Sequence, residues 1–347
     1  MDLIDVDWPI VQAPMAGTST PEMAAAVSNA GALGSIAVGA ATVEAASKAI
    51  QHVRLGTSRP FNVNVFCHAK PRRDRDKERK WLKFLGPEFA VFNTAAPASL
   101  AEIYTSFCED DAMYAVIREA RPKVVSFHFG LPGPQWIAGL KETGIVLFAT
   151  ATSPKEAHAA VDAGVDVIVA QGYEAGGHRG VFDPDGPDDR LSTFPLVQLL
   201  CRELDVPVLA AGGIMDGKGI GAALQLGAAG VQLGTAFIAT DESAADEGYR
   251  VALFSDAARH TVMTRAISGR PARCLSNTFT RLGQSARLDA VPDYPIAYDA
   301  GKALNSAAKA TGNLSYGAHW AGQGAPLARA LPAGQLVEAL IEELRAG

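Results

Sequence analysis

Short apolar runs rich in β-branched residues recur along the chain, with helix-length stretches between them. Nearly every position within a run is apolar, which is typical of strands buried on both faces of a parallel sheet. Eight βα units of this kind predict a TIM (β/α)8 barrel, whereas a doubly wound open sheet would need fewer strands. The eight predicted strands span residues 9–14, 32–38, 61–66, 124–129, 145–150, 165–171, 206–213 and 230–237.

The stretches between the runs carry signals for the start and end of helices. Thr20 precedes Pro21, and Ser153 precedes Pro154, with Glu156 three residues after the serine. A capping hydroxyl followed by proline in the first turn is typical of a helix N-terminus. Glycines that suit a left-handed C-terminal cap come just before the next strand, at Gly31, Gly144, Gly164 and Gly227.

Two segments do not fit a minimal barrel. Residues 67–95 interrupt the third βα unit with charged residues and Trp81. Residues 241–332 follow the eighth strand and are predicted to form a small, mainly helical second domain over one mouth of the barrel. The last residues, 333–347, have helical periodicity and are expected to supply the last barrel helix, so that residues 1–240 and 333–347 form the barrel domain.

Composition narrows the class of protein. The chain has 347 residues, 48% of them hydrophobic, and a formal net charge of -6. The basic run at 70–80 is mixed with acidic residues and is interpreted as a salt-bridged helix face, so nucleic acid and anionic membranes are not expected partners. The first eight residues are acidic where a signal peptide would be basic, and no apolar segment has the length of a membrane span. We therefore expect a cytoplasmic protein.

The cysteines show no pattern of a metal site or a disulfide framework. Cys67, Cys108, Cys201 and Cys274 lie far apart, without a CxxC pair. Free cysteines are among the most buried residue types, so four ordinary buried thiols are expected.

Polar residues at the predicted strand ends indicate where the chemistry lies. In a TIM barrel, the active site is built at the carboxyl ends of the strands. A ring of amide, hydroxyl and imidazole groups there suits a flat polar heterocycle, and the lack of paired carboxylates argues against a glycosidase or a metal-dependent hydrolase. We expect no metal. The residues of this ring are Gln12 to Met15, Asn64, His128, Thr150, Gln171, Gly212, Gly213, Gln232 and Thr235.

The seventh and eighth predicted strands carry a phosphate-site pattern. "AAGGIMDGKG" and "GVQLGTAF" place Gly212, Gly213, Gly234 and Thr235 at the ends of adjacent strands, before turns that lead into helices. Backbone N–H groups that no Cβ obstructs, at a helix N-terminus, bind phosphate well. Together with the polar ring, this pattern suggests FMN. The alternative, that these glycines only permit close strand–helix packing, stays open.

The stretch "QGYEAGGHRG" at 171–180 follows the sixth strand. Its glycines would let the main chain pass close to a planar cofactor, and His178 would be the side chain suited to proton transfer near neutral pH. A lone histidine can also be a hydrogen-bonded structural residue. His128, in "SFHFG", is either a substrate contact or a buried hydrogen-bonded ring.

These motifs resemble one known family. "PIVQAPMAGTSTPEMAAAVSNAGALGS", "RPFNVNVF", "SFHFG", "QGYEAGGHRG", "PVLAAGGI", "VQLGTAF", "SGRPAR" and "WAGQG" together are similar to the class I nitronate monooxygenases, over nearly the whole chain. The resemblance implies an FMN-binding TIM barrel with a small second domain. It also implies a detoxifying flavoprotein that oxidises alkyl nitronates, such as propionate 3-nitronate, with O2 to a carbonyl compound and nitrite, without metal. A homodimer is a further expectation.

The resemblance also implies roles for individual residues. His178 would act as base on neutral nitroalkanes and orient a nitronate that is already deprotonated. Substrate size would be decided by residues 67–95 and by the loop 315–324, whose Tyr316 and Trp320 suit a lid over an apolar cavity or, alternatively, plain interdomain packing. The flavin contacts would fall on Ala13, Pro14, Met15, Asn64, Gln171, Gly176, Gly212, Gly213, Gln232, Leu233, Gly234 and Thr235.

Two other functions remain to be distinguished. One is an FMN-dependent NAD(P)H oxidoreductase of the enoyl-ACP reductase or quinone reductase type, which shares "EAGGH" and "LGT". The other is a non-catalytic flavin- or phosphate-binding sensor, which would not need an imidazole over the cofactor. No second glycine-rich turn that would suit a dinucleotide is found in the sequence.

Overall fold

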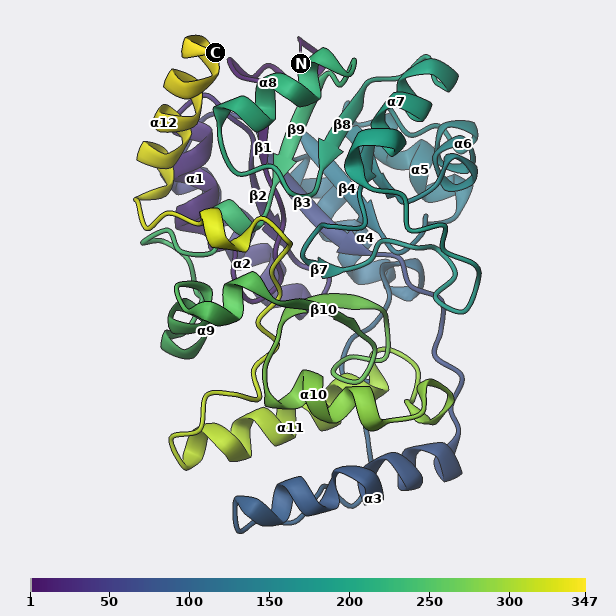
Figure 1. Cartoon of the computed structure of the whole chain (residues 1–347). Helices are drawn as coiled ribbons and strands as arrows, with labels where there is room; N and C mark the ends of the chain where they lie inside the picture. The colour runs from purple at the N-terminus through teal and green to yellow at the C-terminus, as the bar shows by residue number, and fades with distance from the viewer. Residues whose placement is uncertain (1) are drawn as a thin grey trace.

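Eight parallel strands form the central sheet of a computed structural model that describes residues 2–347 (Figure 1). Backbone hydrogen bonds between Leu33 and residues 10 and 12 join the first strand to the second and close the sheet. All eight predicted strands are present, so the predicted TIM barrel is confirmed. The strands are β1 (Ile10–Gln12), β2 (Gly34–Ala37), β3 (Phe61–Phe66), β4 (Val124–His128), β5 (Val146–Ala151), β6 (Val167–Gln171), β8 (Val208–Ala211) and β9 (Gly230–Leu233).

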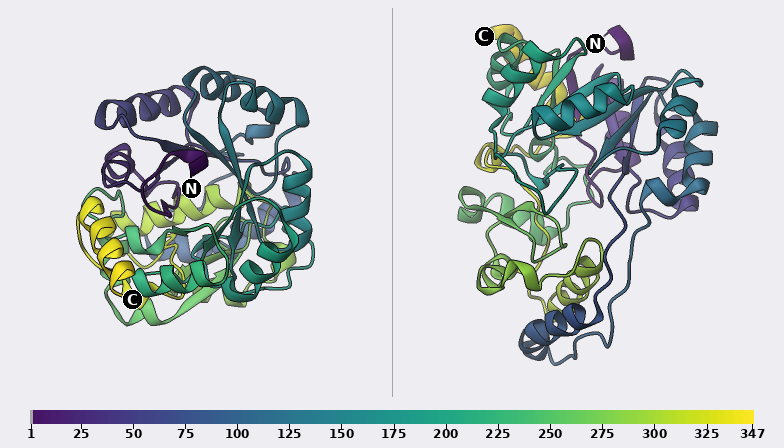
Figure 2. Two further views of the ribbon diagram at one scale, coloured as in Figure 1. Left: turned by 90° about the horizontal axis from the view of Figure 1, so that it is seen from above. Right: turned by 90° about the vertical axis from the view of Figure 1, so that its right-hand side faces the viewer.

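Helices surround this sheet, as the view from above shows (Figure 2). Apolar side chains from the strands and from the surrounding helices form one buried cluster between them. The last helix packs against α1 and α8, as its periodicity predicted. The surrounding helices are α1 (Pro21–Asn29), α2 (Val43–Gly56), α4 (Asp111–Ala120), α5 (Pro134–Lys141), α6 (Pro154–Asp162), α7 (Thr193–Glu203), α8 (Gly217–Gln225) and α12 (Ala333–Ala346).

The helix ends follow the capping signals of the sequence. The Thr20 hydroxyl accepts a hydrogen bond from the Met23 N–H at 3.0 Å, and the Ser153 hydroxyl accepts one from the Glu156 N–H at 3.3 Å. Positive φ angles of 88°, 81°, 97° and 102° confirm the left-handed caps at Gly31, Gly144, Gly164 and Gly227.

A second layer lies below the carboxyl ends of the barrel strands (Figure 1). It includes a small antiparallel sheet in which β11 pairs with β10 and with β7, a two-residue strand from the loop after β6. The sequence analysis did not predict these strands. The layer contains α3 (Arg75–Val91), α9 (Glu247–Leu253), α10 (Thr278–Ser285), α11 (Ile296–Ala310), β7 (Gly177–His178), β10 (Thr261–Thr264) and β11 (Ala272–Leu275).

Single turns of 3-10 helix complete the chain. They are η1 (Asp2–Ile4), η2 (Phe107–Glu109), η3 (Thr235–Phe237), η4 (Asp256–Arg259), η5 (Leu288–Ala290) and η6 (Ala325–Leu327). Within residues 2–347, no helix is both long and apolar enough to cross a bilayer.

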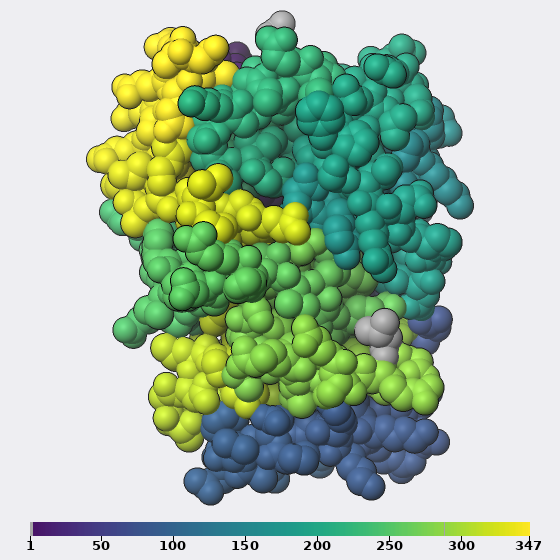
Figure 3. All heavy atoms as spheres, viewed as in Figure 1, coloured from purple at the N-terminus to yellow at the C-terminus, as the bar shows by residue number. Residues whose placement is uncertain are grey.

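Helix α3 belongs to the second layer although it comes from the first half of the chain. Long connections carry it away from the barrel and back (Figure 2). Its side chains Trp81, Leu85 and Phe89 join the apolar cluster of the second layer, and its atoms lie below those of residues 241–310 (Figure 3). Of the charged run 70–80, only the part from Arg75 onward is helical. The domain boundaries at 240 and 332 stay a prediction. Helix α3 packs with the predicted second domain although it lies outside these boundaries.

The cysteines differ in part from the expectation of four buried thiols. All four are free, and Cys67 and Cys274 are buried, whereas Cys201 is half-buried and Cys108 is exposed. Cys108 lies on the single turn η2, in which Phe107 is the residue that packs inward. The expectation is therefore wrong for Cys108.

Candidate active site

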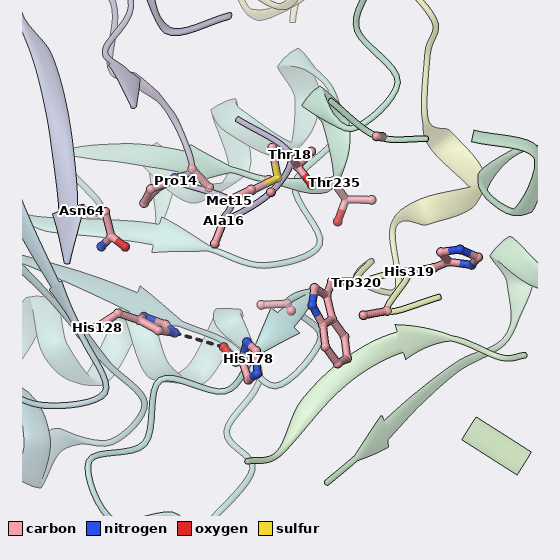
Figure 4. Close-up of a pocket in the computed structure, with 18 of the residues that line it drawn as sticks. Pro14, Met15, Ala16, Thr18, Asn64, His128, His178, Thr235, His319 and Trp320 are labelled. Carbon is pink, nitrogen blue, oxygen red and sulfur yellow. Dashed lines mark hydrogen bonds between the residues drawn. The ribbon is translucent and has the colours of Figure 1, made fainter. Parts of the chain in front are cut away.

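A cavity of about 460 Å³ lies between the barrel and the second layer, at the carboxyl ends of the strands (Figure 4). The structure brings every predicted site residue except Gln12 to its wall. These residues are Ala13, Pro14, Met15, Asn64, His128, Gln171, Gly176, His178, Gly212, Gly213, Gln232, Leu233, Gly234, Thr235, Tyr316 and Trp320. No residue of 67–95 in the described chain lines the cavity, but His68 packs edge-on against Tyr294 and Glu88 accepts a hydrogen bond from the Tyr316 hydroxyl, and both tyrosines line it.

One end of the cavity is built from main chain. Gly212 and Gly213 follow β8 with φ of 123° and 73°, a region that L side chains rarely adopt. Among the described residues, the N–H groups of Gly212, Gly213 and Gly234 have no hydrogen-bond acceptor. The Thr235 hydroxyl accepts a hydrogen bond from the Gly322 N–H at 3.0 Å and can still donate one. This end therefore offers hydrogen-bond donors to an anion.

The predicted helix N-terminus contributes less than expected to this end. At the start of α8, the Gly219 N–H donates to the Asp216 carboxylate at 2.8 Å and the Gly217 N–H donates to the Glu343 carboxylate at 2.9 Å. Because two protein carboxylates already occupy these donors, an anion would be bound by the glycine turns after β8 and β9 rather than by α8.

Amide side chains hold the loops of the barrel mouth. Gln12 is fully buried and bonds Ser19 and Ser35, so it supports the loop 13–19 and does not reach the cavity. Gln171 donates to the His178 carbonyl at 3.0 Å and accepts from the Gly180 N–H at 2.8 Å, which fixes the turn that carries the histidine. The polar residues predicted at the strand ends therefore include some that hold the loops in place and some that face the cavity.

Asn64 is the amide that is left free to face a ligand. Its Nδ2 donates to the Ser126 hydroxyl at 2.9 Å and to the Ser126 carbonyl at 3.0 Å. Its Oδ1 has no hydrogen-bond partner among the described residues. This oxygen can accept a hydrogen bond from a ring N–H in the cavity.

His178 lies on β7, beside Trp320 (Figure 4). The Ser268 hydroxyl donates to the Arg270 carbonyl oxygen at 3.3 Å, so it accepts from the Nε2–H of His178 at 2.8 Å. Nδ1 is then the unprotonated nitrogen, and it has no hydrogen-bond partner among the described residues. Burial, followed by the charges of His128 and Arg270, lowers the pKa of His178 to about 3. The ring is therefore a neutral proton acceptor at neutral pH.

His128 has both ring nitrogens engaged. Its Nε2–H donates to the His178 carbonyl at 3.2 Å, and its Nδ1 lies 3.1 Å from the Thr150 hydroxyl (Figure 4). Burial, then the charge of Arg270, lowers its pKa to about 4. Of the two alternatives, the geometry favours a hydrogen-bonded ring that supports the backbone at 178.

Aromatic and basic residues that the sequence analysis missed form another part of the cavity wall. Tyr298 and Lys302 lie one helical turn apart on α11, and Tyr104 and Tyr294 come from neighbouring loops. The Lys302 ammonium lies 4.9 Å and 5.4 Å from the ring centroids of Tyr104 and Tyr298, and burial lowers its pKa. Among the described cavity-lining residues, it is the one lysine or arginine.

The two predicted lid aromatics have different surroundings. The Trp320 ring centroid lies 5.1 Å from that of His178 and 6.4 Å from that of Tyr298. The Tyr316 hydroxyl donates to Glu88 on α3, and its ring packs edge-on against Phe92. Trp320 thus lies beside His178, while Tyr316 attaches the loop to α3.

The glycines of the 171–180 loop have a packing role as well as a place on the cavity wall. A Cβ at Gly176 would lie 2.4 Å from the Gly322 backbone nitrogen, and one at Gly180 would lie 2.6 Å from the Thr150 side chain. Two segments of main chain therefore meet here without side chains between them. Residues 2–347 contain no cluster of three metal-ligating side chains.

Comparisons with known proteins give the family. A family model described as nitronate monooxygenase matches residues 1–343. The chain is 58% identical to a nitronate monooxygenase of Paraburkholderia phytofirmans over 345 residues, which cover 99% of this chain and 94% of that protein.

Solved structures agree with this result. A nitroalkane oxidase from Streptomyces ansochromogenes has a TM-score of 0.90 and 41% identity, over 99% of this chain and 97% of that one. FabK from Thermotoga maritima has a TM-score of 0.75 and 32% identity, over 99% and 95% of the two chains. The chain belongs to the nitronate monooxygenase family, because the family model spans almost its whole length and a relative of that name is 58% identical to it.

Proposed function

We propose that the protein is an FMN-dependent monooxygenase that oxidises small alkyl nitronates, such as propionate 3-nitronate, with O2 to a carbonyl compound and nitrite. The observation that carries the proposal is the free Nδ1 of a neutral His178, in the wall of a cavity that also has an anion-binding end and a lysine. A cytoplasmic location and a homodimer, both expected at the outset, stay predictions.

The wall of the cavity fits FMN. Gly212, Gly213, Gly234 and Thr235 would hold a terminal phosphate, and Asn64 Oδ1 would accept a hydrogen bond from the ring system. A Cβ at Gly234 would meet no atom closer than 3.5 Å, so space remains on this side for a ligand. When bound, FMN would supply the acceptor for electrons from the nitronate and their donor to O2.

His178 would treat two substrate forms differently. A neutral nitroalkane still has its α-proton, and the unprotonated Nδ1 can remove it. A nitronate has already lost this proton and needs only to be oriented. The hydrogen bond to Ser268 and the Gln171 bond to the 178 carbonyl hold the imidazole in position for both forms.

The wall around Lys302 suits an anion. Its ammonium would attract the nitro oxygens of a nitronate, while Tyr104, Tyr298 and Trp320 exclude water around them. A partly buried cation interacts more strongly with an anion than an exposed one, because water screens the charge less. This wall favours the nitronate over the neutral nitroalkane.

A second candidate function is the reduction of an enoyl or quinone substrate by NAD(P)H, because FabK shares 32% identity and the fold. A nicotinamide dinucleotide needs positions for two further phosphates. Within the described residues, the cavity wall provides one lysine and the glycine turns assigned to FMN. The cavity therefore supports the oxygenase better than the reductase.

The proposal is tested on the purified protein. We expect a yellow protein that releases FMN, and not FAD, after denaturation and chromatography, and that releases nitrite when propionate 3-nitronate and air are added. Release of FAD, absence of flavin, or absence of nitrite from a flavin-loaded protein would each contradict it.

A further inference from the structure

Thr193, the first residue of α7, holds the glycine turn at the anion-binding end of the cavity. Its hydroxyl donates to the Gly212 carbonyl oxygen at 3.0 Å and lies 3.3 Å from the Ala211 carbonyl oxygen. The side chain is 7% exposed, and it is not part of the cavity wall. Thr193 can therefore affect a ligand only through the backbone that it holds.

The two carbonyl groups determine where the next two N–H groups point. The peptide bonds before and after Gly212 are trans, and the C=O and N–H of a trans peptide point in opposite directions. Because the Gly212 carbonyl points to Thr193, the Gly213 N–H points away from it. The Ala211 carbonyl also accepts from the Gly172 N–H at 2.8 Å, so the Gly212 N–H points away from Gly172. These are two of the N–H groups that have no acceptor among the described residues.

The Thr193 hydroxyl is itself held in a fixed place. Ser192, at the N-cap of α7, makes no capping hydrogen bond with its side chain. The Glu174 carboxylate takes that role, because its two oxygens lie 2.9 Å and 3.1 Å from the Thr193 nitrogen and accept its N–H. A Cβ at Gly172 would lie 2.1 Å from the Thr193 hydroxyl oxygen, and one at Gly212 would lie 2.8 Å from it. The hydroxyl reaches the turn because both positions are glycine.

Without this hydroxyl, little would keep the peptide between Gly212 and Gly213 in its orientation. Their φ angles are 123° and 73°, and glycine has access to many other backbone conformations. A peptide that turned over would place its carbonyl oxygen, and not its N–H, toward the cavity. A carbonyl oxygen repels a phosphate, whereas an N–H attracts it. The hydrogen bond from Thr193 therefore favours the orientation that suits an anion.

We propose that Thr193 is a positioning residue that makes the cavity prefer a phosphorylated flavin, because it holds the Gly212–Gly213 peptide with its N–H directed at the phosphate. This inference rests on the proposed function, since it takes FMN as the ligand. Riboflavin has the same ring system and ribityl chain but no phosphate, so its binding does not depend on this N–H. Thr193 thus acts on the selection between FMN and riboflavin.

The test starts from the FMN-loaded full-length protein. Dilution gives the Kd of FMN from the fluorescence of the released flavin, and competition with riboflavin gives the Kd of riboflavin. Thr193→Val replaces the hydroxyl by a methyl group of similar size, and we expect a Kd for FMN that is roughly threefold to tenfold higher, the effect of one hydrogen bond. The Kd of riboflavin should not change. Thr193→Ser keeps the hydroxyl and should restore the affinity for FMN.

A second threonine provides the matched control. The Thr143 hydroxyl donates to the Leu140 carbonyl at 2.6 Å, and Thr143 does not line the cavity. Thr143→Val should therefore bind both flavins like the unmodified protein. Thr193→Ala removes the same hydroxyl and replaces Thr193→Val if the valine variant does not fold.

The outcomes separate this inference from the proposed function. An unchanged Kd for FMN in the variants without the hydroxyl, an equal rise in Kd for both flavins, or a serine variant as weak as the valine variant would overturn the role of Thr193 alone. An unmodified protein that binds no FMN would contradict the proposed function, and this inference with it.

Discussion

A single hydrogen bond determines which nitrogen of His178 can take a proton. Ser268 accepts from Nε2–H because its own hydroxyl proton points to the Arg270 carbonyl. We predict that Ser268→Ala lowers kcat/KM for neutral nitroethane roughly threefold to tenfold, the effect of one net hydrogen bond. Ser268→Thr keeps the hydroxyl and should restore the rate. Steady-state nitrite release with both variants measures this, and equal losses in both would show that the hydroxyl is not what matters.

Substitution of His178 distinguishes a base from an orienting group. His178→Asn should lower kcat/KM for a neutral nitroalkane by roughly 10²–10⁴-fold, the usual effect of removing a positioned base. The loss with the corresponding nitronate should be much smaller, because that substrate has no α-proton to remove. The ratio of the two losses is the measured quantity. A ratio near one would show that His178 binds or orients and does not abstract the proton.

The pH dependence of the same reaction follows from the low pKa of His178. A base must be unprotonated to act, and with a pKa of about 3 this imidazole stays unprotonated above pH 4. We therefore predict no loss of kcat/KM for a neutral nitroalkane between pH 8 and 5 that is assignable to His178. A histidine with the usual pKa of 6.5 would cause a fall of more than tenfold over this interval, and pH profiles of His178→Asn and the unmodified protein would reveal it.

At the scale of elements, the turn after β9 would bind the phosphate of FMN under the proposed function. Gly234→Asp should abolish FMN binding, because a carboxylate would lie against the phosphate. Gly234→Asn has the same shape without the charge and is the matched control, and Gly234→Ala should retain flavin because its Cβ would meet no atom closer than 3.5 Å. The flavin-to-protein absorbance ratio after desalting measures the outcome. If the aspartate variant retains stoichiometric FMN, the phosphate lies elsewhere.

Helix α11 carries Lys302, whose charge would favour the ionised substrate under the proposed function. Lys302→Met keeps most of the apolar stem and removes the ammonium, so we predict a roughly tenfold higher KM for a nitronate and little change for a neutral nitroalkane. Lys302→Arg keeps the charge and serves as the control. Substrate-specific KM values measure this, and parallel increases for both substrates would indicate a loss of packing.

The sequence predicted the elements with continuous apolar patterns and missed those that depend on distant contacts. The barrel strands and the glycine caps were recognisable because each signal is local. In contrast, β7, β10 and β11 are only two to four residues long, and the residues of β7 and β10 are half-buried, so these strands lack a pattern that separates them from loops. Tyr298 and Lys302 did have a signal, a spacing of four on one helix, but only the fold shows that this face of α11 meets the barrel.

Residues that the sequence placed correctly still differ in what they do. Gln12, Gln171 and His128 were identified from their positions at strand ends, yet most of their hydrogen bonds go to the protein itself. Strand-end position predicts proximity to the cavity, whereas the direction of a hydrogen bond depends on neighbours that are far away in the chain. Ser268 shows the same limit, because it reaches His178 only through the pairing of β7 with β11.

At the scale of the whole molecule, four histidines with lowered pKa values predict that the folded protein is less stable in acid. Burial is the largest cause of a lower pKa in each: about 4 for His68, His128 and His319, and about 3 for His178. The unfolded chain therefore binds protons below about pH 6.5 that the folded chain does not bind. The free energy of unfolding is therefore highest above that pH. It falls as the pH drops toward 4, by up to about 1.4 kcal/mol per pH unit for each histidine.

Urea unfolding at pH 7, 6 and 5 measures this slope. His68→Asn, a substitution of a 1% exposed ring, should reduce the slope by about one proton without changing its sign. A free energy of unfolding that stays constant or rises as the pH falls from 7 to 5 would show that these histidines are protonated in the folded protein.

The most direct test of the whole account is anaerobic mixing of the flavin-loaded protein, first with NADPH and then with propionate 3-nitronate, followed by the admission of air. The account predicts that NADPH leaves the flavin spectrum unchanged on the timescale of turnover, that the nitronate changes it at once, and that air restores the oxidised spectrum with release of nitrite. Fast bleaching of the flavin by NADPH, with no nitrite from the nitronate, would contradict the account and assign the cavity to a reductase.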